Sequence, residues 1–190
     1  MVAAELVHHD VALRHKIFFT VPPPPEVAAR ILRLGDKLSE GDELRGRRTP
    51  PDRLHVSLNG LGAYAALPRK LIVRSCGVVS AIRFPSFVLA FNRVMSFGGK
   101  AGVRPLVLTG DEGMIGADML YGEIHAALAG AGLIELRARP FTPHLTLSWE
   151  DGPRAERVIE PIAWRVPEFH LVDSVHGQSR HDVLGKWALE

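Results

Sequence analysis

The chain has 190 residues, a formal net charge of +2, 46% hydrophobic residues and 23% charged residues. This balance is typical of a globular protein and excludes disorder over most of the length, and the length suits one domain. The single cysteine, Cys76, excludes an internal disulfide and favours a reduced, cytoplasmic setting.

The first elements alternate between strand and helix. Residues 1–15 contain acids and histidines where a secretory signal needs an apolar core, so they are predicted to be an N-terminal extension. A strand is predicted at 16–21, and the prolines at 22–25 end it, because proline cannot donate to a sheet ladder. Apolar residues then recur at helical spacing and predict an amphipathic helix over 26–38. No apolar run approaches the roughly 18 residues of a membrane span, so no membrane contact is expected.

A polar segment at 39–53 follows this helix and is predicted to be a loop. It carries several cations: Arg45, Arg47, Arg48 and Arg53. These arginines form either an ordinary solvated loop or a basic lip that steers a phosphate-bearing substrate.

The remaining elements complete a mixed order. They are a strand at 53–61, a helix at 66–80, strands at 84–94 and 103–110, a helix at 115–130, and strands at 143–149, 167–175 and 181–189. His125 lies one position off the apolar face of its helix and is given no role. The order is neither a series of βαβ units nor all-β, so it predicts an α+β fold with helices packed on antiparallel-rich sheets. Residues 16–190 are expected to form a single domain.

Two of the predicted strands carry the same pattern, one in each half of the chain. In RLHVSLNGLG (53–62), His55 and Ser57 alternate with leucine and valine, and in FTPHLTLSW (141–149), His144 and Thr146 alternate with leucines. Residues two apart share one face of a strand, so each histidine should project together with its hydroxyl. A helix precedes the patterned strand in each half, which indicates a weak internal duplication.

These four side chains suit phosphoryl chemistry. Imidazole can act as acid or base near neutral pH, and hydroxyls can donate to phosphate oxygens without adding charge. The motifs lack the carboxylates or thiolates that usually complete a metal site, so neither metal nor cofactor is expected. His-x-Ser/Thr occurs about once by chance in such a chain, so the pattern alone leaves open two unrelated surface strands with polar outer faces.

The chain resembles the 2H phosphoesterases, in particular the RNA 2′,3′-cyclic phosphodiesterases of the LigT-like (2′-5′ RNA ligase) family. KIFFTVPPPPEVAARI (16–31) is similar to that family's opening strand, prolines and helix. RLHVSLNGLG is similar to its first His-x-Thr-x motif, and RPFTPHLTL (139–147) to its second, which is the most specific match. The closing segments EFHLVDSV and GKWAL are similar to its final hairpin.

The resemblance implies a bilobal α+β fold with pseudo-twofold symmetry, helices on the outer faces of the sheets, and an active-site cleft between the lobes. It implies an enzyme that hydrolyses 2′,3′-cyclic phosphate ends of RNA, or cyclic nucleotides, to 2′-phosphates without a metal. Reversible 2′-5′ RNA ligation is a further implied activity. By the resemblance His55 is the acid and His144 the base, although the symmetry of the reaction leaves this assignment open, and Ser57 and Thr146 hold the phosphate. A cytoplasmic monomer is expected.

Two residues depart from the family pattern. Ser57 stands where threonine is usual, which keeps the hydroxyl. Trp149 stands where relatives that act on RNA often carry arginine, so Arg137, Arg139 or the arginines of 45–53 would have to compensate.

Two alternative functions stay open. One is a cyclic phosphodiesterase that acts on a small nucleotide such as ADP-ribose cyclic phosphate. The other is a non-catalytic module that binds nucleotides or RNA ends, although pure phosphate binding would favour arginine or lysine over two histidines.

Overall fold

The structure is a computed structural model that describes residues 12–41, 45–98, 102–138, 140–178 and 180–190. Its strands are β1 (His15–Val21), β2 (Arg47–Arg48), β3 (Val56–Tyr64), β4 (Phe87–Ser96), β5 (Arg104–Thr109), β6 (Leu145–Glu150), β7 (Arg157–Val166), β8 (Glu168–Val175) and β9 (Asp182–Ala188). Its α-helices are α1 (Pro25–Glu40), α2 (Arg69–Val79) and α3 (Ile115–Gly130). Short 3-10 turns lie at Pro51–Arg53 and Glu112–Met114.

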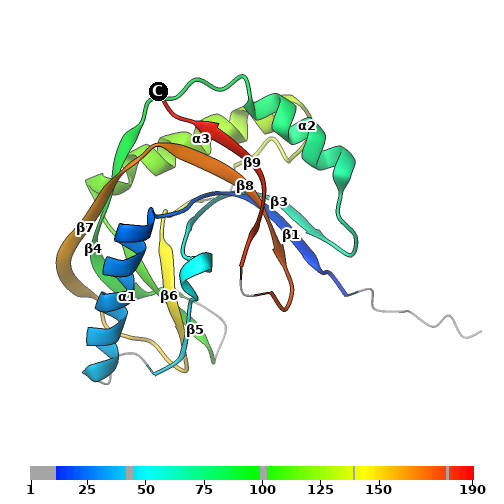
Figure 1. Ribbon diagram of the computed structural model, residues 1–190. Helices are drawn as coiled ribbons and strands as arrows, with labels where there is room; N and C mark the ends of the chain where they lie inside the picture. Colours follow the sequence, from blue (N-terminus) through cyan, green and yellow to red (C-terminus); the bar gives the residue numbers. More distant parts are fainter. Residues whose placement is uncertain (1–11, 42–44, 99–101, 139, 179) are drawn as a thin grey trace, which may run out of the picture.

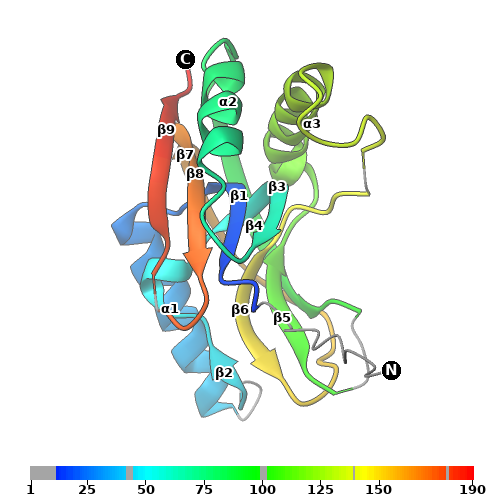
Figure 2. The same cartoon turned by 90° about the vertical axis from the view of Figure 1, so that its right-hand side faces the viewer.

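The strands form one antiparallel sheet in the order β7-β4-β5-β6-β3-β1-β8-β9, with β2 added beside β6. Figure 1 shows that the sheet is strongly curved, with α2 and α3 along its upper side and α1 apart from them, beside β7. In Figure 2, α2 and α3 stand next to each other and α1 lies lower in the molecule. The two strands that carry the histidine motifs, β3 and β6, are neighbours at the middle of the strand order. The α+β prediction is therefore confirmed, and the order of strands puts both motifs at one place.

The amphipathic pattern accounts for α1. Its buried residues, Val27, Ile31, Gly35 and Leu38, follow one stripe of the helix. Pro25 occupies the first helical position, where its fixed φ and missing N–H cost nothing. The helix thus begins and ends within two residues of the range predicted from the sequence.

Aromatic side chains fill the core on both sides of the central strands. On the β1–β8–β9 side, Phe19 and Phe169 are fully or almost fully buried and pack with Trp187. On the β4–β7 side, Phe91 packs against Trp164, with their ring centroids 5.6 Å apart. These contacts stabilise the two halves on either side of β3 and β6, and so support the site between them.

One long strand, β7, was not predicted from the sequence. Its segment RVIEPIAWRV contains a proline and several charged residues, and half of its positions are exposed. The strand lies at the edge of the sheet, the position where a proline is tolerated because one side of the strand needs no ladder hydrogen bond. The edge position therefore explains why this segment can form a strand although its proline and exposed charges are not typical of one.

The beginning of the described chain joins the sheet. His15, the last residue of the predicted extension, is the first residue of β1 and its Nδ1 lies 2.6 Å from Asp173 Oδ2. Residues 1–11 of that extension lie outside the described residues. None of the described helices is both long enough and apolar enough to span a membrane.

Candidate active site

The pairing of β3 with β6 brings the two histidine motifs together. Val56 pairs with Leu145 in antiparallel register, and each of these residues lies between the histidine and the hydroxyl of its motif. Counting outward from this pair sets His55 opposite Thr146 and Ser57 opposite His144. Directly opposed side chains lie about 5 Å apart and diagonal neighbours about 7–8 Å apart. The two imidazoles are diagonal neighbours, and so are the two hydroxyls.

The burial of the two segments fits this arrangement. Val56, Leu58, Leu145 and Leu147 are buried, whereas the two histidines and the two hydroxyl residues between them are only partly buried. The alternation predicted from the sequence is therefore present, with the leucines and valine facing the core. Each histidine lies one residue before the start of its strand, a small difference from the predicted ranges.

Both imidazoles are held by the same backbone contact. Nδ1 of His55 lies 2.7 Å from the carbonyl oxygen of Arg53, and Nδ1 of His144 lies 2.7 Å from that of Thr142. A carbonyl oxygen can only accept, so Nδ1 carries the hydrogen in both rings and Nε2 is the nitrogen left for other partners. His55 Nε2 accepts a hydrogen bond from the Ser57 hydroxyl at 2.9 Å. Each ring thus has one fixed nitrogen and one nitrogen available for proton transfer.

An aromatic ring also packs against each histidine. Phe18 lies 5.2 Å from His55 and Phe97 lies 4.7 Å from His144, measured between ring centroids. His181 adds an edge-on contact to His55 at 4.8 Å. The histidines are therefore restricted in rotation from the side as well as by the backbone, which keeps each Nε2 in a defined direction.

All four predicted side chains, His55, Ser57, His144 and Thr146, line one cleft of about 970 Å³. The described residues that line it include five cations and no carboxylate; the cations are Arg14, Lys16, Arg47, Arg48 and Arg53. A cleft lined by charges of one sign concentrates ligands of the opposite sign. The cleft is therefore suited to an anionic ligand such as a phosphate ester.

The surroundings of His55 favour its neutral form. Burial lowers the pKa of His55 to about 3, against the opposing hydrogen bond to the Arg53 carbonyl, and the nearby charges of His181, Arg53 and Lys16 lower it further. Burial, together with Arg53 and Lys16, also lowers the pKa of His181 to about 4. Both rings are therefore neutral at pH 7.

The arginines of the predicted loop have different partners. Arg48 donates to Asp36 and to the carbonyl oxygen of Leu32, and Arg53 donates to Ser174 Oγ at 2.8 Å and to a backbone carbonyl of the β8–β9 turn. Within the described part of the chain, the Arg47 side chain has no hydrogen-bond or ion-pair partner, and it lines the cleft. Arg47 is therefore the arginine of this loop that is left for a ligand.

Two other arginines, Arg137 and Arg139, were expected as possible replacements for the arginine that Trp149 displaces. Arg137 is exposed and is not among the residues that line the cleft. Arg139 lies outside the described residues. Arg137 therefore does not contribute to the lining of the cleft.

Three residues that contact the histidines were not predicted as site residues. His181 stands at the start of the last strand, Phe97 follows β4, and Phe18 lies within β1. Phe18 is buried in β1 like its neighbours, and Phe97 follows β4 in the segment predicted to be a turn, so no local signal distinguishes either ring. His181 directly precedes β9, a strand that also carries Asp182 and Lys186, so its sequence did not mark it as part of the site. Among the described residues, no three His, Cys, Asp or Glu side chains are grouped so as to hold a metal ion.

Comparison with known proteins gives structural but not sequence-level matches. No family model matches the chain, and no curated protein matches it. The apo structure of E. coli LigT matches with a TM-score of 0.70 and 27% identity, over 94% of this chain and 99% of that chain. A Thermus thermophilus protein, TT0787, matches with a TM-score of 0.69 and 24% identity, over 92% and 97%. A further structure described as a phosphoesterase matches with a TM-score of 0.72 and 22% identity, over 92% and 98%.

The matches extend over nearly the whole of each protein, so they concern the complete arrangement of helices and strands and not a shared fragment. E. coli LigT has been described in complex with 3′-AMP, NADP+, phosphate and ATP. The resemblance drawn from the sequence is confirmed by these structural matches: the chain has the fold of LigT and of the LigT-like 2H phosphoesterases.

Proposed function

We propose that this chain is a phosphoesterase that hydrolyses the 2′,3′-cyclic phosphate at an RNA end to a 2′-phosphate, with His55 and His144 as its acid–base pair and without a metal. One observation carries the proposal: the pairing of Val56 with Leu145 sets two histidines and two hydroxyls around one point of a basic cleft. The structural match to E. coli LigT, which has been described with phosphate and with 3′-AMP, supports it.

The reaction needs two proton transfers at one phosphorus atom. One neutral imidazole removes a proton from water as the water oxygen attacks phosphorus, and a new P–O bond forms. The opposite bond, to the ribose 3′ oxygen, breaks, and the other histidine, as imidazolium, protonates that oxygen. The 2′ oxygen keeps the phosphate. Each transfer contributes roughly 10²–10⁴ to the rate. The same steps with the 5′-hydroxyl of a second RNA in place of water give 2′-5′ ligation.

The surroundings of the two histidines favour a specific division of these roles. His55 lies beside Lys16, Arg53 and His181, and its Nε2 already accepts a hydrogen bond, so its neutral form is favoured. A neutral imidazole suits the base. We therefore assign the base to His55 and the acid to His144, the reverse of the assignment that the resemblance implies.

The remaining groups at the site stabilise the phosphate. The hydroxyls of Ser57 and Thr146 face the same point as the imidazoles. Thr146 can donate to one non-bridging oxygen, and Ser57 can donate to the other once its hydrogen turns away from His55 Nε2, which also frees that nitrogen to act as the base. Lys16 and Arg53 supply positive charge on the His55 side of the cleft. Donors fixed before the reaction stabilise the charge that develops in the transition state without reorganising.

We further infer that residues 16–190 act as one bilobal domain with pseudo-twofold symmetry. Support comes from the strand order, in which four strands extend on each side of the boundary between β6 and β3, and from the matching backbone contacts of the two histidines. The expected cytoplasmic location and monomeric state stay predictions.

A small nucleotide is the second candidate substrate. E. coli LigT has been described in complex with ATP and with NADP+, so a structurally similar protein binds nucleotides that are not RNA ends. A cyclic phosphodiesterase of this kind would use the same four side chains, and it would turn over a cyclic mononucleotide as fast as a cyclic RNA end. A module that only binds nucleotides would turn over neither.

The proposal predicts turnover that a chelator does not reduce. Incubation with an RNA that ends in a 2′,3′-cyclic phosphate should give a 2′-phosphate at the same rate with and without EDTA, because the proton transfers need only the histidines. Phosphorus NMR identifies the product isomer. A rate that EDTA abolishes and a divalent ion restores would overturn the metal-free mechanism, and a mixture of isomers would mean that the substrate is not held in one register.

A further inference from the structure

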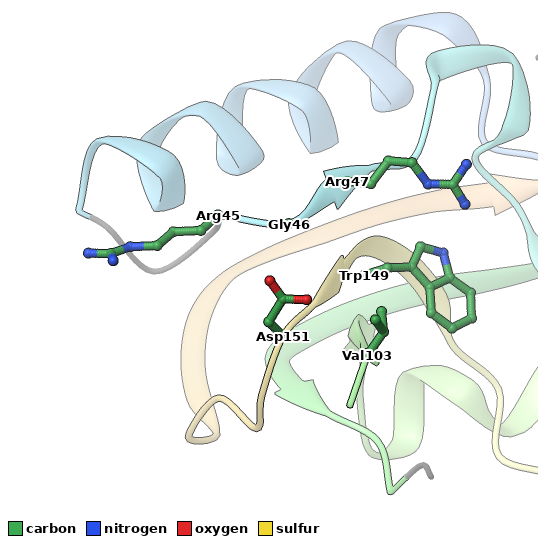
Figure 3. Close-up of a pocket in the computed structure, with 6 residues that line it drawn as sticks. All are labelled: Arg45, Gly46, Arg47, Val103, Trp149 and Asp151. Carbon is green, nitrogen blue, oxygen red and sulfur yellow. The ribbon is translucent and has the colours of Figure 1, made fainter. Parts of the chain in front are cut away.

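A second cavity adjoins the cleft on the side of β2. It has a volume of about 630 Å³ and is lined by Arg45, Gly46, Arg47, Val103, Trp149 and Asp151. In Figure 3, Arg45, Gly46 and Arg47 come from β2 and the segment leading into it, Trp149 and Asp151 lie at the end of β6, and Val103 is the residue before β5. Arg47 and Trp149 line both this cavity and the cleft, so the two hollows meet at these two residues.

A bulge in β6 turns Trp149 toward the cleft. Along β5, Leu106 pairs with Ser148 and the next residue, Val107, pairs with Thr146, so Leu147 is an extra residue in β6. An extra residue reverses the alternation beyond it. Trp149 consequently faces the same side as Thr146, and 41% of its surface is exposed, although it is a large apolar residue.

Arg47 is fixed beside this tryptophan by the backbone. In β2, Arg47 pairs directly with Trp149, and Figure 3 shows the guanidinium and the indole extending in the same direction from their strands. Gly46 allows the close approach of the two strands, because a Cβ at this position would overlap the Trp149 carbonyl oxygen.

A buried carboxylate holds the segment before Arg47 in place. Glu150 is fully buried, and its Oε2 accepts hydrogen bonds from the backbone N–H groups of Arg45 and Gly46, each at 3.0 Å. Ser148 and Arg154 donate to the same carboxylate. The backbone position of Arg47 is therefore fixed by these contacts, while its guanidinium has no partner in the described part of the chain.

An exposed aromatic ring beside an unpartnered cation is the combination that binds single-stranded nucleic acid. A base can stack on the ring whatever its identity, and the cation can pair with the backbone phosphate. Because Leu147 is an extra residue, Thr146 and Trp149 pair with Val107 and Pro105, which are two residues apart in β5, so Trp149 lies roughly 7 Å along the strand from the phosphate site. That separation is suited to the nucleotide next to the reacting one, with the second cavity beyond it.

We propose that Trp149 and Arg47 form a binding subsite for the nucleotide on the 5′ side of the cyclic end, with Trp149 stacking on its base and Arg47 pairing with its phosphate. This inference rests on the proposed function and narrows the substrate to an oligonucleotide end. The Asp151 carboxylate in the second cavity can accept hydrogen bonds from base amino or ribose hydroxyl groups.

Binding of two product-like ligands tests the subsite without depending on turnover. The ligands are adenosine 2′-phosphate and a trinucleotide RNA that ends in a 2′-phosphate, and calorimetry gives both affinities. The wild-type chain should bind the trinucleotide roughly tenfold or more tightly, because its additional base stacks on Trp149 and its additional phosphate pairs with Arg47. Equal affinities would overturn the proposal.

Variants separate the subsite from the reacting centre. Trp149→Ala should remove most of the preference for the trinucleotide, and Trp149→Phe should keep most of it because a ring is still present. Arg47→Ala should reduce the preference and lower the slope of log affinity against log salt by about 0.7, the value for one phosphate of a single strand. Arg69→Ala, which removes an exposed arginine on α2, is the matched control and should change neither measurement.

The outcomes distinguish the subsite from the proposed function. If Trp149→Ala and Arg47→Ala weakened both ligands equally, the two residues would act at the reacting end, and the subsite proposal would be wrong. If the wild-type chain preferred the trinucleotide through Trp149 and Arg47 but did not hydrolyse a cyclic end, the subsite would stand and the proposed hydrolysis would be wrong.

Discussion

Replacing either His55 or His144 by alanine is expected to lower turnover of a 2′,3′-cyclic RNA end roughly 10²–10⁴-fold. Each variant removes one of the two proton transfers, and the remaining histidine cannot make both. The double variant should be little slower than the slower single one, because the two groups act as a unit. Single-turnover kinetics measures these effects without interference from product release.

Controls for these variants follow from the structure. Both side chains lie at the surface of a cleft, so circular dichroism and thermal unfolding should report normally folded proteins. His125→Ala is a matched control, since His125 contacts Tyr121 and a backbone carbonyl outside the cleft. If both single variants turned over at the wild-type rate, the acid–base assignment of the site would be wrong.

The largest shift in a protonation equilibrium is expected at the imidazole of His55. Burial and three neighbouring basic residues lower the pKa of His55 from 6.5 to about 3, so the ring should stay neutral across the whole range in which an ordinary histidine becomes charged. A pH titration of the imidazole nitrogens by NMR measures this, and the His55→Gln variant assigns the resonance. Phosphate bound in the cleft should raise this pKa, because an anion favours the imidazolium.

The same shift predicts how stability depends on pH. Below pH 6.5 the unfolded chain gains a proton on His55 that the folded chain does not take up until about pH 3. The free energy of unfolding should therefore fall as the pH drops through this window, and His181 adds to the loss in the same direction. His55→Gln should lose less stability on acidification. A titration midpoint near 6.5 for His55 in the free protein would contradict this description of the site and the base role assigned to it.

The sequence predicted which faces of the two motif segments are buried better than it predicted the sheet that joins them. Alternation of histidine and hydroxyl with leucine and valine is a local property, and it correctly predicted which face of each segment is buried. The pairing of Val56 with Leu145 joins residues far apart in the chain, and no local pattern specifies a non-local register. The resemblance to a known family, not the alternation, supplied the expectation that the two segments meet.

Two features of the sheet were not predicted from the sequence, and each has a physical explanation. The edge strand β7 contains Pro161 and exposed charges, which argue against a strand unless its place in the sheet is known. The bulge at Leu147 reverses the alternation in β6, so a strict period of two would put Trp149 on the face of Leu145. Both features depend on the neighbouring strand and not on the segment itself, and the second of them creates the exposed tryptophan of the proposed subsite.

A crystal structure of the chain with adenosine 2′-phosphate tests the central claim most directly, since the claim is that the two histidine motifs form one phosphate site. We expect the phosphate between His55 and His144, with each Nε2 within about 2.6–3.2 Å of one of its oxygens and with the hydroxyls of Ser57 and Thr146 donating to others. A phosphate bound elsewhere on the molecule, or one in contact with only one of the two histidines, would contradict it.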